Sequence, residues 1–319
     1  MSRLGGIFFD LKFKLTILGS GGAIPTVQKK PTSQFLNVQE RYFLIDCGEG
    51  TQIQLRKYAC KFQKIDNIFI SHLHGDHYLG LIGFLSSLNL LGRNRPINVY
   101  APEKLKKILD VHQEVNGRSF DYEIVFHPLT FNDIALLYED TLLKIFSFPV
   151  LHSVSTCGFL FKEKKRPRNL IKEKISQYKI PVSKLNSIKL GNDFIENEIV
   201  IKNSELTISP YKERSYAYCA DTLYDEKILK YIKNVDLLYH EATFLSPMLN
   251  RAKSTKHSTA EQAALIAKKA MVDKLLIGHF SSRYKDIKLF ESEAKNIFEP
   301  TVAVSDGDQF EIPLKQSNT

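Results

Sequence analysis

Apolar residues recur along this chain with two spacings, one typical of strands and the other typical of helices. Short runs rich in β-branched and aromatic residues predict strands at residues 14–19, 41–48, 67–71 and 97–102. Between these runs, residues 50–62 and 78–92 place their apolar side chains on one helical face. The first third of the chain therefore predicts alternating strands and helices.

The rest of the chain continues this alternation. Strands are predicted within residues 142–150, 216–222, 235–243, 274–280 and 301–312, and a helix is predicted at 258–271. That helix opens with Ser-Thr-x-x-Gln, the pattern of a capping box, and ends in lysines that suit the negative end of the helix dipole. The 319 residues are 43% hydrophobic and 25% charged, which is typical of a globular α/β protein.

The cysteines and the apolar runs indicate the compartment. Cys47, Cys60, Cys157 and Cys219 are widely separated, lie in apolar contexts and form no CxxC pair, so we expect reduced thiols. Residues 1–18 mix charges among their apolar residues, and no run approaches the length of a membrane span. We therefore predict a cytoplasmic protein that does not cross a membrane.

Positive charge is concentrated in one stretch. Residues 162–189 contain ten lysines or arginines and two glutamates, a net charge of +8, whereas the whole chain carries +9. Such a run is often only a solvated, mobile surface. Beside a catalytic site it would instead favour a polyanionic partner.

A dense cluster of metal-binding residue types follows the strand predicted at 67–71. His72, His74, Asp76 and His77 fall within six residues. A catalytic Zn²⁺ takes about three protein ligands, so these four are too many for one ion and too close in the chain to complete two. Further ligands are expected where later strands end, and the residues in those positions are His152, Asp221 and His279.

Taken alone, either later histidine would more commonly be a hydrogen-bonded core residue. The cluster at 72–77 is different, because crowding several desolvated polar groups without a cation is costly. His112 and His127 lack such neighbours, and we interpret both as structural. The glycine-rich segments at 19–26 and 46–52 are either tight turns or loops that contact phosphate.

Several motifs together resemble one family. They are LGSGGAIPT, DCGEGTQIQL, SHLHGDHYLGL, LHSVSTCGF, CADT, HEAT, HST and GHFSSRY, and they run from about Lys14 to about Gly307. The first metal motif is similar to that of the metallo-β-lactamase fold. HEAT and HST together resemble ribonuclease Z, the endonuclease family that matures tRNA 3′ ends.

The resemblance implies an α/β fold, the αββα metallo-β-lactamase sandwich, as a single domain over residues 1–319. Residues 162–205 would form an inserted, protruding basic exosite arm. Two Zn²⁺ ions per subunit are implied, with one ligand group of His72, His74 and His152, a second group of Asp76, His77 and His279, and Asp221 as the bridge.

By the same resemblance, His257 protonates the departing 3′ oxygen, Glu241 holds His257, and Asp76 orients or deprotonates the attacking water. The family is usually a homodimer in which the arm of one subunit holds tRNA for the site of the other. The residues expected to bind precursor tRNA are Lys164, Lys165, Arg166, Lys184 and Lys189.

The residues leave three functions open. The first is a zinc-dependent endoribonuclease that removes the 3′ trailer from precursor tRNA and leaves a 3′-hydroxyl on the tRNA. The second is another metallo-β-lactamase-fold hydrolase acting on a small phosphodiester or ester, which explains the metal residues but not the +8 stretch. The third is an RNA-binding protein with a structural zinc site, which would not need Glu241 and His257.

Overall fold

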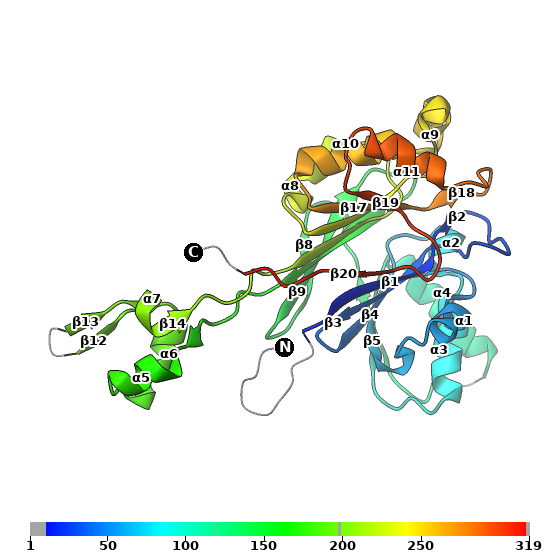
Figure 1. Ribbon diagram of the computed structural model, residues 1–319. Coiled ribbons are helices and arrows are strands. Elements are labelled where there is room, and N and C mark those ends of the chain that lie inside the picture. The colour runs from blue at the N-terminus through cyan, green and yellow to red at the C-terminus, as the bar shows by residue number, and fades with distance from the viewer. Residues whose placement is uncertain (1–10, 118, 197–198, 317–319) are drawn as a thin grey trace.

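Two seven-stranded sheets lie face to face, with helices on both outer faces (Figure 1). The computed structural model describes residues 11–117, 119–196 and 199–316. The first ten residues, part of the segment 1–18 considered in the sequence analysis, lie outside the described residues. The predicted αββα sandwich is confirmed.

The first sheet is built mainly from the N-terminal half of the chain, and the second from the C-terminal half. The first has the order β20 (Gln309–Glu311), β1 (Phe13–Gly19), β3 (Ser33–Val38), β4 (Arg41–Cys47), β5 (Ile65–Phe69), β6 (Ile97–Ala101) and β7 (Ile124–Pro128). The second has the order β19 (Thr301–Ala303), β17 (Lys274–Gly278), β16 (Leu237–Glu241), β15 (Ser215–Cys219), β10 (Thr156–Glu163), β9 (Leu143–Val150) and β8 (Ala135–Glu139).

Helices cover the outer faces of both sheets. The first sheet packs against α1 (Thr51–Lys57), α3 (Leu81–Leu90) and α4 (Lys104–Val115), and the second against α8 (Leu229–Ile232), α10 (Ala260–Ala270) and α11 (Lys288–Lys295). The predicted cap of α10 is confirmed, because Thr259 and Gln262 form a reciprocal capping box.

The second sheet is buried on both faces, which explains its nearly continuous apolar strands. In β15, Tyr216 and Tyr218 join the core between the sheets, whereas Ala217 and Cys219 join the core beneath the helices. Successive side chains of a strand point to opposite faces, so each strand contributes to both cores. All four cysteines are free, and three of them are buried.

Most predicted elements are present, with three corrections. Residues 301–312 are not one strand: β19 belongs to the second sheet and β20 to the first, and a turn at Gly307, with φ of 97°, carries the chain between them. The helix predicted at 50–62 ends at Lys57, just before the left-handed Ala59. The helix predicted at 78–92 begins only at Leu81.

Residues 164–213, which lie between the end of β10 and Arg214, the residue before β15, project from the body as an arm (Figure 1). It has its own small core of Ile180, Ile188, Phe194, Ile201 and Leu206. The sequence predicted the arm at residues 162–205. In the structure, residue 162 still belongs to β10, and residue 205 lies inside α7, before the arm ends. The arm elements are β11 (Asn169–Leu170), α5 (Lys172–Gln177), α6 (Val182–Lys189), β12 (Phe194–Glu196), β13 (Ile199–Ile201), α7 (Asn203–Leu206) and β14 (Thr207–Ile208).

Among the described residues, no helix combines the length and apolar character needed to cross a membrane.

Candidate metal centre

The predicted ligand cluster lies where β5 meets the single-turn helix α2 (Gly75–Tyr78). His72 and His77 are fully buried, whereas His74 and Asp76 are partly exposed. The chain leaves the sheet after Phe69 and turns before α2, which keeps these four side chains at one edge of the sheet.

Asp46, at the end of β4, anchors this turn. Its buried carboxylate accepts hydrogen bonds from the Ser71 N–H (2.7 Å), the Ser71 hydroxyl (2.9 Å) and His77 Nδ1 (2.7 Å). Tyr218 donates to the same carboxylate from the facing sheet. Asp46 is not among the site residues predicted from the sequence, although a carboxylate closing an apolar strand beside a glycine-rich motif is a signal for such a role.

A hydrogen bond at Nδ1 also orients the rings of His72 and His152. The Ser71 hydroxyl gives its proton to Asp46 and therefore accepts the Nδ1 proton of His72, at 3.0 Å. His152 donates its Nδ1 proton to the carbonyl of Lys256, at 2.7 Å. In both rings Nε2 is left as an unprotonated nitrogen, because a neutral imidazole carries only one proton.

His279 follows β17 in the left-handed conformation, with φ of 60°. Its Nδ1 lies 2.9 Å from the Thr243 hydroxyl, which gives its own proton to Glu241. The Nδ1 of His279 is therefore the donor, and its Nε2 is unprotonated as well.

Ring nitrogens of five histidines face one another. His77 Nε2 lies 3.3 Å from His279 Nε2, and His74 Nδ1 lies 3.1 Å from His72 Nε2 and 3.2 Å from His152 Nε2. Lone pairs at these distances repel one another when no proton lies between them. A metal cation removes the repulsion, because neutral imidazole nitrogens are among its preferred ligands.

Asp221 lies between the two groups of histidines. Its Oδ1 is 3.2 Å from His279 Nε2 and 3.4 Å from His77 Nε2, and its Oδ2 is 3.6 Å from His72 Nε2. Among the described residues, Oδ1 has no hydrogen-bond donor although it is buried. The donor atoms converge within 4.8 Å in three groups: His72, His74, His152 and Asp221; Asp76, His77 and His279; and Asp221, His257 and His279. The first two groups are those predicted from the sequence, and the third brings His257 beside them.

The electrostatics differ between the histidines of the cluster. Burial lowers the pKa of His72, His74 and His152, so these rings are kept neutral, as metal ligands must be. Burial lowers the pKa of His77, but Asp221, Asp46 and Asp76 together hold it well above its ordinary value. Positive charge is therefore stabilised at this position. Imidazole nitrogens with carboxylate oxygens are a donor set that fits Zn²⁺, so the residues present fit the implied metal.

Glu241 and His257 form a pair beside the cluster. His257 Nδ1 lies 2.9 Å from Glu241 Oε1 and 4.0 Å from Asp221 Oδ2. Glu241 is fully buried, and it also accepts the N–H groups of Thr222 (3.1 Å) and Ser258 (3.0 Å). Burial lowers the pKa of His257, but the Glu241 carboxylate raises it to about 9.

The five predicted arm residues occupy two kinds of position. Lys164 Nζ lies 2.7 Å from Glu139, and Arg166 lies 3.3 Å from Glu163, so both form ion pairs where the arm leaves the body. The remaining three are exposed, and they are Lys165, Lys184 and Lys189. None of the five lies in the metal cluster.

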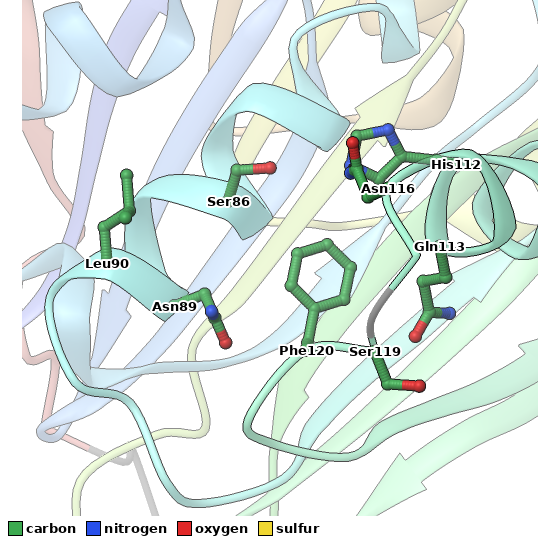
Figure 2. Close-up of a pocket in the computed structure, with 8 residues that line it drawn as sticks. All are labelled: Ser86, Asn89, Leu90, His112, Gln113, Asn116, Ser119 and Phe120. Carbon is green, nitrogen blue, oxygen red and sulfur yellow. The ribbon is translucent and has the colours of Figure 1, made fainter.

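The two histidines interpreted as structural lie outside the cluster. His112 accepts from Asn116 at 2.9 Å and stacks on Phe120, at the rim of an open hollow of about 320 Å³ (Figure 2). His127 bonds Asn98 at 2.9 Å and stacks on Tyr100. Their ring contacts are those of ordinary packed histidines.

Comparisons with known proteins place this geometry in a family. Ribonuclease Z of Bacteroides fragilis is 44% identical over 292 residues, which cover 91% of this chain and 96% of the relative. Ribonuclease Z of Parabacteroides distasonis is 41% identical over 301 residues, which cover 94% and 99%. A family model described as anti-Pycsar protein Apyc1 matches residues 13–144.

Solved structures give the fold. Human tRNase Z, short form, superposes with a TM-score of 0.69 at 24% identity, covering 94% of this chain and 99% of the other. The metallo-β-lactamase fold protein YhfI from Bacillus subtilis has a TM-score of 0.66 at 17% identity, covering 94% and 99%. This chain has the metallo-β-lactamase fold and, by identity above 40% over nearly its whole length, belongs to the ribonuclease Z family.

Proposed function

We propose that this protein is a zinc-dependent endoribonuclease that cleaves precursor tRNA at its 3′ end, removes the trailer and leaves a 3′-hydroxyl on the tRNA. The observation that carries the proposal is the match to relatives named ribonuclease Z, which spans 91% of this chain and 96% of the relative and therefore includes the arm. A hydrolase of small phosphodiesters would have no use for the basic stretch.

Two Zn²⁺ ions are proposed, one held by His72, His74 and His152 and the other by Asp76, His77 and His279, with Asp221 bridging. Such a pair of ions lowers the pKa of bound water to about 7 and so supplies hydroxide for attack on a phosphodiester. Asp76 stays ionised, since His77 and His279 outweigh the effect of burial and hold its pKa far below its usual range. As a carboxylate it can accept a hydrogen bond from the water and so orient it, whereas its lowered pKa makes it a weak proton acceptor.

His257 is the proposed general acid. Its Nδ1 proton is committed to Glu241, and no described residue bonds its Nε2. Its side chain is 15% exposed, so Nε2 is the nitrogen left to give a proton to the departing 3′ oxygen. Glu241 fixes the ring and favours its protonated form.

The arm is proposed to bind tRNA phosphates through Lys165, Lys184 and Lys189, with Lys164 and Arg166 at its base. β10 starts just after His152 and reaches the arm at Glu163. Its eight residues put the arm base roughly 25 Å from the metal centre at about 3.3 Å per residue. Figure 1 shows the arm extending farther away from α2.

This direction supports a homodimer as the working form. An arm that leads away from its own site could present tRNA to the site of a second subunit. We also propose a cytoplasmic location, where precursor tRNA would be available to the enzyme.

The proposal is tested by offering the purified protein a precursor tRNA with a 3′ trailer and, in parallel, a small chromogenic phosphodiester. We expect cleavage at the tRNA 3′ end, abolished by chelator and restored by Zn²⁺. Turnover of the small ester alone would favour the alternative hydrolase, and tRNA binding without cleavage would favour an RNA-binding protein.

A further inference from the structure

Asp306 closes the glycine-rich loop that precedes β3. Its Oδ1 accepts the N–H (2.9 Å) and the hydroxyl (2.8 Å) of Ser20, and its Oδ2 accepts the N–H of Lys30 (2.8 Å). Gln54 Nε2 donates to the same Oδ2 at 3.2 Å. One carboxylate thus ties the beginning of the loop to its end and both to α1.

The turn inside this loop lies directly on the metal centre. Ala23, with φ of 61°, donates its N–H to Asp76 Oδ2 at 2.6 Å. Gly22 packs on the ring of His279 so closely that a Cβ atom at position 22 would lie 2.6 Å from Cε1 of that ring. This loop therefore contacts Asp76 and His279, two of the three residues in one ligand group.

The loop is also joined to the strand that follows His279. β2 (Gly21–Gly22) pairs in parallel with β18 (Phe280–Ser281), and the Phe280 N–H donates to the Ser20 carbonyl at 3.1 Å. Movement of the loop would shift His279 along with Asp76. The Ala23 N–H is already used by Asp76, which argues against a phosphate-binding role for this N–H.

We propose that Asp306 is a positioning residue that, through the loop at residues 20–30, holds Asp76 and His279 in place to bind one of the two metal ions. The inference rests on the proposed metal centre. Groups behind metal ligands fix ligand orientation, and their removal commonly weakens metal binding by about 10-fold to 100-fold. Asp306 would act indirectly: it holds the backbone of the loop, and the loop in turn contacts Asp76 and His279.

The test is zinc binding by Asp306→Asn, measured as competition between the metal-free protein and a chromophoric chelator. An Asn side chain has a single acceptor oxygen, so it cannot accept from the backbone N–H groups of both Ser20 and Lys30. We expect one Zn²⁺ to bind as tightly as in the wild type and the other about 10-fold to 100-fold more weakly.

Asp308→Asn is the matched control. Asp308 Oδ2 accepts the N–H of Ser305 at 2.8 Å, within the same turn, and makes no side-chain bond to the loop. Both affinities should stay unchanged in this variant. Gly22→Ala perturbs the same ligand group from the other end and should reproduce the loss at one ion, even if Asp306→Asn folds poorly.

Two results overturn the inference. Unchanged affinity for both ions in a folded Asp306→Asn variant would show that Asp306 does not position the ligands, whatever the result for Gly22→Ala. An equal loss at both ions would show a general structural role. If the wild type itself binds fewer than two ions, the proposed metal centre fails, which is a different outcome from either of these.

Discussion

Glu163 and Arg214 form a buried, two-pronged ion pair at the point where the arm joins the body. Arg214 Nη2 lies 2.7 Å from Glu163 Oε1, and Arg214 Nε lies 3.0 Å from Glu163 Oε2. The side chain of Arg214 is only 3% exposed and that of Glu163 only 2%. Arg214 also donates to the carbonyl of Ile312 at 3.0 Å, so both stalks of the arm and the C-terminal segment meet at one pair.

We expect Glu163→Gln to lower the free energy of unfolding by roughly 3 to 5 kcal/mol, because it leaves the Arg214 charge buried and unpaired. Burial raises the pKa of Glu163, but Arg214 outweighs it, and the net pKa is lowered. The pair therefore stabilises the protein at neutral pH, and its contribution is lost as the pH falls through this lowered pKa. Urea unfolding at several pH values measures both effects.

The double variant Glu163→Gln with Arg214→Met is the control for this prediction. It removes the unpaired charge, so it should recover much of the lost stability at neutral pH. A Glu163→Gln variant as stable as the wild type at pH 7 would contradict the assignment of a stabilising pair.

Removing a metal ligand should remove metal from the affected group. We expect His74→Ala to lose one Zn²⁺ per subunit, and Asp221→Ala to weaken both ions, since Asp221 reaches both groups. Each variant should lose nearly all cleavage of precursor tRNA. Zinc content by elemental analysis and turnover are measured together, with His112→Ala as the histidine control outside the cluster.

Replacing the proposed general acid should have a different signature. We expect His257→Ala to keep its metal and to lose cleavage by roughly two to four powers of ten, the usual contribution of acid–base catalysis. Loss of zinc, or cleavage at the wild-type rate, would assign His257 another role.

The pH profile tests the link between Glu241 and His257. A general acid must be protonated, so the rate should fall as the pH rises through the pKa of His257, which Glu241 raises. Glu241→Gln removes that effect and should move the alkaline limb of kcat/KM to lower pH by about one unit or more. If the alkaline limb of Glu241→Gln stays where it is in the wild type and the zinc content is unchanged, Glu241 does not set the pKa of the general acid.

The arm, residues 164–213, can be deleted without dividing a hydrophobic core. Ile180 and Ile188 pack with Phe194, Ile201 and Leu206, so a partial deletion would expose this cluster, whereas removal of residues 164–213 takes it away whole. Lys162 pairs with Ser215, and the Glu163 N–H donates to the Arg214 carbonyl at 2.9 Å. A two-residue Asn-Gly turn can therefore join β10 to β15.

We expect this excision to raise KM for precursor tRNA greatly and to leave turnover of a small phosphodiester nearly unchanged. Each lost phosphate contact should reduce the log–log salt slope of tRNA binding by roughly 0.7 to 0.9. Mixing arm-less subunits with His74→Ala subunits should restore cleavage if the arm serves the partner's site. Failure to restore it in proven mixed dimers would contradict that arrangement.

The sequence by itself determined features that depend on residues close together in the chain. The turn from His72 to His77 and the capping box of Thr259 and Gln262 are set by local spacing, and both are found in the structure. Strands were predictable from short apolar runs, although 301–312 could not be divided correctly. The later ligands could be chosen only because strand ends in this fold gather at one edge.

Only the tertiary structure decided which distant residues support the site. Asp46 holds His77, Asp306 accepts the N–H of Lys30 and so closes the loop beside Asp76, and Glu163 pairs with Arg214 at the arm base. In the sequence Asp306 and Glu163 look like any other carboxylates, and Glu163 even counts against the basic stretch. The partners of the three carboxylates lie 31, 276 and 51 residues away, and contacts at such separations are set by sheet register and packing, which local patterns do not encode.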